Sequence, residues 1–139
     1  MKNSIASRIH RTLKHLTSYR DILEKSDSVL NYVDTIPLQE DDAIIGIYEN
    51  FPGEPKESIA LSNLGMYVFL NEKWEFIGYR HIDYTEVPST KQDSEKIIIH
   101  MLSGQTMDIL IRGAQDKFRD VFEFLHFLDR VVNDVRSQS

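Results

Sequence analysis

The sequence contains no cysteine, which excludes a disulfide framework, a thiol nucleophile and a cysteine-based zinc site. No apolar run approaches the roughly 18 residues of a membrane-spanning helix. The first residues, MKNSIASRIHRTLKH, lack the apolar segment of a secretory signal peptide. A cytoplasmic location is therefore the expectation.

The sequence also lacks the short motifs of common enzymes. It has no glycine-rich phosphate loop, no G-x-S-x-G and no H-E-x-x-H, and its carboxylates show no metal-ligand spacing. His10 and His15 are five residues apart, which does not suit two ligands on one helix face. His81 and His100 fall in different expected strands and could meet across a sheet, but the favoured interpretation is that they are ordinary surface or half-buried histidines. We expect no catalytic residue, metal or cofactor, and an enzyme is only a third alternative.

The charge is unevenly distributed along the 139 residues. Residues 1–25 hold six basic and two acidic side chains, whereas the rest of the chain holds 10 basic and 20 acidic ones. Such an acidic body argues against nucleic acid as a partner. The length fits one domain over residues 1–139, with a helical segment at 1–40 and a strand-rich part at 41–139.

Hydrophobic spacing predicts an N-terminal helix over Ser4–Lys25 and a short second helix before Pro37. From Ala43 the pattern becomes β-branched and aromatic, with Gly, Pro and Asn at the breaks. Six or seven antiparallel strands follow, and a long helix closes the chain. The expected strands are Ala43–Asn50, Glu57–Asn63, Met66–Asn71, Trp74–Ile82, Ile82–Val87, Ser94–Leu102 and Thr106–Gly113, and the helix is Ala114–Arg136. The fold class is α+β, with a bent antiparallel sheet or small barrel capped by this helix.

The stretch SIALSNLGMYVFLNEKWEFIGYRHIDYTEV, the hairpin KIIIHMLSGQTMDILIRG and the closing DKFRDVFEFLHFLDRV carry a resemblance. This pattern of strands, turns and terminal helix resembles pleckstrin-homology-like domains, especially the GRAM-like and bacterial PH-like groups, over residues 43–135. The resemblance implies a PH-like barrel and raises the question of phosphoinositide binding. It also implies a scaffold that elsewhere binds peptides or proteins.

A phosphoinositide headgroup needs several Lys or Arg side chains around the loop after the first strand of this fold. The loop here, FPGEPKE, offers only Lys56 against Glu49, Glu54 and Glu57, and Lys73 lies near Glu72 and Glu75. This departure argues against a strong anionic-lipid site. Two prolines stiffen the loop, so Phe51 and Lys56 form either a recognition loop or simply a rigid turn.

The terminal helix has more apolar surface than one sheet needs. Its first stripe, which should close the barrel, contains Phe118, Val121, Phe122, Leu125, Leu128 and Val132. A second stripe contains Phe124, Phe127 and Val131, and leaving its phenylalanines in water would forgo about 1.5–3 kcal/mol each. The first helix, a second copy of the chain or a partner could cover this second stripe.

The N-terminal helix is basic through Arg8, Arg11 and Lys14. It could lie on an anionic membrane, enter a partner's groove or pack on its own domain. The acidic body would oppose a membrane. The sequence therefore favours a non-catalytic protein-interaction or regulatory module with a protein partner or self-association. The alternative is a peripheral membrane or lipid-binding module that uses the basic helix.

Overall fold

The computed structural model describes residues 5–13, 16, 18–21, 28–51, 54–87, 96–112 and 117–137. These residues form two α-helices, eight short strands and two 3₁₀ segments, η1 and η2. In chain order these are α1 (Ile5–Leu13), β1 (Tyr19–Asp21), η1 (Ser28–Thr35), β2 (Ile44–Tyr48), β3 (Ile59–Ser62), β4 (Gly65–Leu70), β5 (Lys73–Gly78), η2 (Tyr79–His81), β6 (Ile82–Glu86), β7 (Lys96–Met101), β8 (Thr106–Leu110) and α2 (Lys117–Ser137). The fold is α+β, as the sequence predicted.

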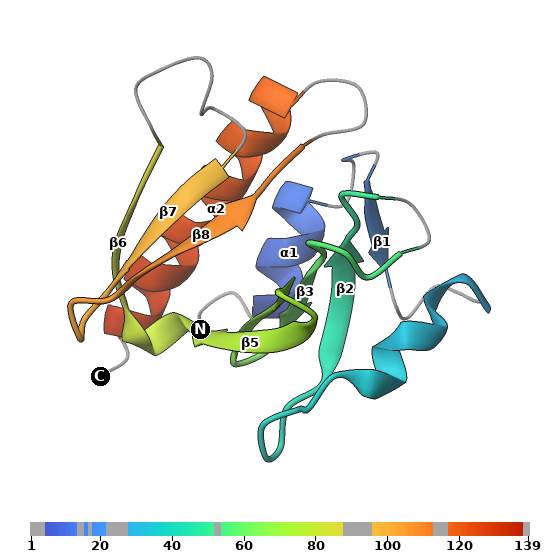
Figure 1. Ribbon diagram of the computed structural model, residues 1–139. Helices are drawn as coiled ribbons and strands as arrows, with labels where there is room; N and C mark the ends of the chain where they lie inside the picture. Colours follow the sequence, from blue (N-terminus) through green and yellow to red (C-terminus); the bar gives the residue numbers. More distant parts are fainter. Residues whose placement is uncertain are drawn as a thin grey trace.

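The strands form two antiparallel sheets whose order follows the chain (Figure 1). The first sheet runs β1-β2-β3-β4-β5 and the second β6-β7-β8. The short η2 turns the chain from one sheet into the other, where the backbone N–H of Leu102 donates to the carbonyl of His81 at 2.9 Å. Among the described residues the sheets do not join into a closed barrel, so the expected barrel is replaced by two sheets set against a helical layer.

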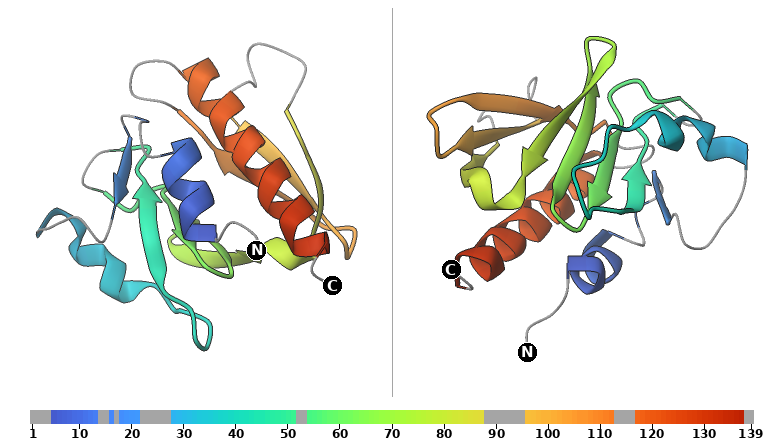
Figure 2. Two further views of the ribbon diagram at one scale, coloured as in Figure 1. Left: turned by 180° about the vertical axis from the view of Figure 1, so that it is seen from behind. Right: turned by 90° about the horizontal axis from the view of Figure 1, so that it is seen from below.

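The two helices lie side by side behind the sheets (Figure 2). α2 runs along the second sheet and packs on β6, β7 and η2, while α1 packs on α2 and on β3. The main core fills the space between the helices and both sheets. It includes Ile9 and Leu13 of α1, Leu61 and Met66 of the first sheet, and Ile99 of the second.

The outer face of the first sheet is also covered. Tyr32 and Ile36 pack there on Ile47, Ala60 and Tyr67. Because both faces are covered, β3 is buried at every residue and the first four residues of β4 are buried too. Alternation of apolar and polar residues is therefore lost in these strands.

Of the predicted N-terminal helix over Ser4–Lys25, the described part ends at Leu13 and the prediction is wrong at Tyr19–Asp21, while residues 22–25 lie outside the described part of the chain. Tyr19–Asp21 is a strand, and it pairs with β2. The tyrosine ring crosses Gly46, where an added Cβ would lie 2.0 Å from its hydroxyl oxygen. The ion pair of Arg20 with Glu49, at 2.6 Å, fastens this strand further. Long-range pairing with β2 has overridden the local helical spacing.

The other strand predictions are confirmed with small shifts of their ends. Trp74–Ile82 is divided, because the strand stops at Gly78 and η2 follows. Residues 88–95, which include the start of the predicted strand Ser94–Leu102, lie outside the described part of the chain. No described helix is both long enough and apolar enough to cross a membrane.

Candidate functional site

The second stripe of α2 is part of the chain's own core. Phe124, Phe127 and Val131 are fully buried. The ring of Phe124 meets Tyr48 edge-on at a centroid distance of 5.2 Å, and Phe127 meets Tyr79 at 6.2 Å. These three residues, considered above as an interface, are thus already covered within one copy of the chain.

The first stripe was predicted less accurately. Val121, Leu128 and Val132 are buried as expected, but the side chain of Phe122 is 71% exposed. The buried arc of α2 is rotated toward α1, since this helix shares the core. The side chain of Phe118 lies outside the described part of the chain.

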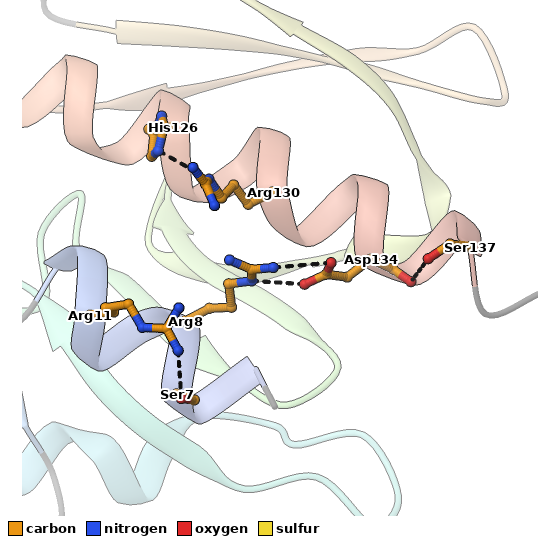
Figure 3. Close-up of polar contacts among 7 residues, drawn as sticks. All are labelled: Ser7, Arg8, Arg11, His126, Arg130, Asp134 and Ser137. Carbon is orange, nitrogen blue, oxygen red and sulfur yellow. Dashed lines mark hydrogen bonds and ion pairs between the residues drawn. The ribbon is translucent and has the colours of Figure 1, made fainter. Parts of the chain in front are cut away.

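The basic residues of α1 serve partly to attach the helix to α2. Arg8 reaches across to Asp134, with Nε and Nη2 at 2.8 and 3.2 Å from the two carboxylate oxygens (Figure 3). Arg11 is exposed and contacts Ser7 at 3.5 Å. Lys14 lies outside the described residues. α1 therefore packs on its own domain, and a cation that could have faced a membrane is paired.

A cavity of about 730 Å³ opens beside the predicted recognition loop. We call it the acidic cavity. Its walls are the β2–β3 loop, the β4–β5 turn and the end of β8. The lining residues are Glu54, Pro55, Lys56, Glu57, Phe69, Leu70, Asn71, Glu72 and Leu110. The structure thus brings together Lys56 and Glu72, which the sequence placed in separate loops.

One side chain fastens the two sheets together at this cavity. The Asn50 amide nitrogen donates to the carbonyls of Glu57 and Leu110 at 2.6 and 2.7 Å. Its amide oxygen accepts from the backbone N–H of Arg112 at 2.7 Å. The guanidinium of Arg112 then pairs with Glu57 at 2.8 Å. Sequence reasoning missed both Asn50 and Arg112.

The two loop residues chosen from the sequence are placed differently. Phe51 is half-buried and not an exposed tip, because two cations lie near its ring. Lys56 Nζ is 5.0 Å and the guanidinium of Arg112 5.7 Å from the ring centroid. Lys56 itself is exposed at the cavity. Phe51 therefore supports the loop, while Lys56 faces solvent.

The charge at the rim is mainly negative. Glu54 and Glu72 are exposed, and within the described residues neither carboxylate has an ion-pair partner. The apolar lining residues Pro55, Phe69, Leu70 and Leu110 are, by contrast, half-buried, and we call them the floor. An apolar floor below unpaired carboxylates suits a ligand that carries both an apolar group and a positive charge.

One of the rim carboxylates, Glu72, lies in an unusual backbone conformation. The turn Asn71–Glu72 has φ of 52° and 67°, the values of a two-residue type I′ hairpin turn. Glycine is the favoured residue at the second position of this turn, yet the chain has glutamate. Glu57 also has a positive φ, of 57°. Since residues other than glycine are disfavoured at such φ values, these residues lower the stability of the fold at the cavity.

A smaller groove of about 200 Å³ lies between β6 and α2. Here the chain satisfies its own polar groups. Arg136 Nη2 donates to the carbonyls of Ile82, at 3.2 Å, and of Asp83, and Thr85 donates to Asp129 at 3.3 Å. We therefore regard the acidic cavity, with its unpaired carboxylates, as the better candidate site.

The described histidines form no metal site. Among the described residues, no group of three or more His, Asp or Glu side chains could hold a metal ion. His100 lies 2.5 Å from Glu86 Oε1 and stacks on Tyr84 at 4.1 Å between ring centroids. His81 belongs to η2 and is exposed.

Comparisons with known proteins add no relative: no protein-family model, curated protein or solved structure matches the chain.

Proposed function

We propose that the protein is a non-catalytic interaction module, and that its acidic cavity binds a basic segment of a protein partner. The observation that carries this proposal is the apolar floor beneath Glu54 and Glu72, two carboxylates without partners in the described chain. A lysine or arginine could pair with this rim while a neighbouring apolar side chain enters the cavity. The sequence of strands followed by a terminal helix supports a PH-like scaffold for this role.

The charge of the cavity favours one class of partner over another. Its ionisable lining is three glutamates and one lysine, and Arg112 already neutralises Glu57. A multiply charged phosphoinositide headgroup would meet repulsion from Glu54 and Glu72 and attraction from Lys56 alone. A basic peptide meets the opposite balance.

The turn geometry gives independent support. A glutamate at a position that favours glycine costs stability, of the order of 1 kcal/mol. Such strain often marks functional sites, where a side chain is retained for its function although another residue would make the backbone more stable. Glu72, whose backbone has a positive φ, lines this cavity.

Selection from a display library of random peptides tests the proposal. Peptides enriched on the wild-type protein should combine Lys or Arg with an aliphatic or aromatic residue. Glu54→Lys and Glu72→Lys should each weaken their binding about tenfold, since one charge-assisted contact contributes about 1.5–3 kcal/mol. Asp34→Lys makes the same charge change at an exposed site on η1 and serves as the control.

Two results would contradict the proposed function. One is a set of enriched peptides without basic residues, and the other is a pair of rim variants that bind the peptides as tightly as the Asp34→Lys control does. Binding that depends instead on Asp129 would move the site to the groove between β6 and α2.

A further inference from the structure

A second pocket, of about 260 Å³, lies at the opposite ends of β4 and β5. We call it the Arg80 pocket. Three segments form it: the approach to β2, the β3–β4 turn, and the end of β5 with η2. Its lining residues are Gln39, Glu40, Leu64, Phe76, Gly78, Arg80 and His81.

A single carboxylate fixes the first two of these segments together. Asp42 Oδ1 accepts backbone N–H bonds from Ala43, Asn63 and Leu64 at 2.9, 3.1 and 3.2 Å. Its Oδ2 accepts the hydroxyls of Ser62 and Tyr67 at 2.7 and 2.8 Å. The walls of the pocket are thus held in place before any ligand arrives.

The other wall is held by backbone contacts and a missing side chain. The N–H of Tyr79 donates to the carbonyl of Leu64 at 3.0 Å, which ties η2 to the β3–β4 turn. A Cβ on Gly78 would lie 2.9 Å from the ring of His81 and 3.3 Å from that of Phe76. Glycine therefore lets these two rings close over the strand.

The pocket combines an apolar wall with an unpaired cation. Leu64 is 44% exposed and Phe76 is half-buried. Arg80 and His81 are exposed, and neither side chain has a hydrogen-bond or ion-pair partner within the described residues. Four other described arginines are bound to carboxylates of the chain: Arg8 to Asp134, Arg20 to Glu49, Arg112 to Glu57 and Arg136 to Asp83. Arg11 contacts Ser7 and Arg130 contacts His126.

We propose that the Arg80 pocket docks an acidic side chain of a protein partner, flanked in the partner's sequence by an aliphatic or aromatic residue. The guanidinium would hold the carboxylate, and Leu64 and Phe76 would contact the apolar neighbour. The Arg80 pocket would thus be a second binding site, which prefers acidic segments where the acidic cavity prefers basic ones. The evidence for it comes from different residues.

The size and charge of the Arg80 pocket limit the kinds of ligand that it could bind. Pockets for drug-sized ligands measure about 300–1,000 Å³, so this one suits an anchoring side chain better than a whole small molecule. Glu40 on the opposite wall lowers the local positive potential. The pocket should therefore prefer a single carboxylate to a phosphate group or an anionic membrane. Both of these carry more negative charge, so a chain of net charge −6 would repel them more strongly.

The same display library tests this second site through a different class of peptide. We expect a group of enriched peptides with Asp or Glu next to an aliphatic or aromatic residue. Arg80→Glu should weaken their binding at least about tenfold, and exchanging the peptide's acidic residue for lysine should restore binding to that variant. Arg130→Glu, an equal charge change at an exposed position of α2, should leave the affinity unchanged.

Several results would overturn the proposal. Selection could yield no acidic peptides, or acidic peptides whose affinity is the same for Arg80→Glu as for the wild type. A third such result is tighter binding of a peptide in which phosphoserine replaces the acidic residue. A dimer seen by light scattering in the wild type and lost in Arg80→Glu would assign the pocket to a second copy of the chain. Basic peptides bound at Glu54 and Glu72 test the first proposal separately.

Discussion

Glu72 shows how one residue can link backbone strain to binding. It has a φ of 67° in a type I′ turn, where glycine would be more stable. We expect Glu72→Gly to raise the free energy of unfolding by about 1 kcal/mol and to weaken the binding of basic peptides. Denaturant unfolding and a binding titration measure the two effects.

The matched control for this substitution is Glu75→Gly in β5. That residue lies within a strand, so glycine should lower stability there by about 0.5–1 kcal/mol. If Glu72→Gly lowered stability as well, the turn would not be strained and the support it gives to the acidic cavity would be lost.

Buried tyrosines give the protein a defined response to alkali. Burial, together with the neighbouring Asp42, raises the pKa of Tyr67 to about 12. Burial also raises the pKa of Tyr79 and that of Tyr32, whose hydroxyl donates to Glu49. In the unfolded chain these phenols ionise near the ordinary value of about 10.

The folded state therefore favours the protonated phenols, and their stabilisation is complete below about pH 10. For Tyr67 it should be lost at about 1.4 kcal/mol per pH unit as the pH rises toward about 12. Denaturant unfolding at several alkaline pH values checks this. Tyr67→Phe is less stable at neutral pH but should lose stability less steeply in alkali, and an equal slope in both proteins would contradict the assignment.

At the scale of elements, α2 separates core from surface within three residues. Phe124 is fully buried against Tyr48, whereas Phe122 is 71% exposed. Phe124→Ala should lower the free energy of unfolding by about 3–5 kcal/mol, and Phe122→Ala should change it by less than about 0.5 kcal/mol. Denaturant midpoints of the two variants, with unchanged slopes, make the comparison.

Equal effects at the two positions would show that the orientation of α2 is wrong. If Phe124→Ala stayed fully stable and altered only self-association, Phe124 would be an interface residue after all, as the sequence had allowed.

The sequence predicted the elements best where the pattern is local. β-branched runs between Gly, Pro and Asn turns predicted β2 to β8 and the long helix within a few residues. It failed at Tyr19–Asp21, because that strand exists only through pairing with β2, more than twenty residues away. The second stripe of α2 was recognised as needing cover, but the rings that meet its phenylalanines, Tyr48 for Phe124 and Tyr79 for Phe127, could be identified only from the structure.

The candidate site was predictable in part for the same reason. The loop from Phe51 to Lys56 stands out through its prolines and charges. Asn50 and Arg112 do not, since their hydrogen bonds connect residues about sixty positions apart. An asparagine at the end of a strand gives no sign that it joins two sheets.

For the whole molecule, net charge governs the response to membranes. The chain carries −6, and Arg8 of α1 is paired with Asp134. We expect no co-sedimentation with anionic vesicles at low salt. Binding at low salt that about 0.5 M salt reverses would instead favour the alternative of a peripheral membrane module.

The measurement that tests the central claim most directly is a titration of the isotope-labelled protein with a selected basic peptide, followed through its backbone amide signals. We expect shifts to concentrate at Glu54 to Glu57, Phe69 to Glu72 and Leu110, and we expect Glu54→Lys to raise the peptide concentration that they require about tenfold. Shifts confined to β6 and α2, or shifts unaffected by Glu54→Lys, would contradict the assignment of the acidic cavity as the binding site.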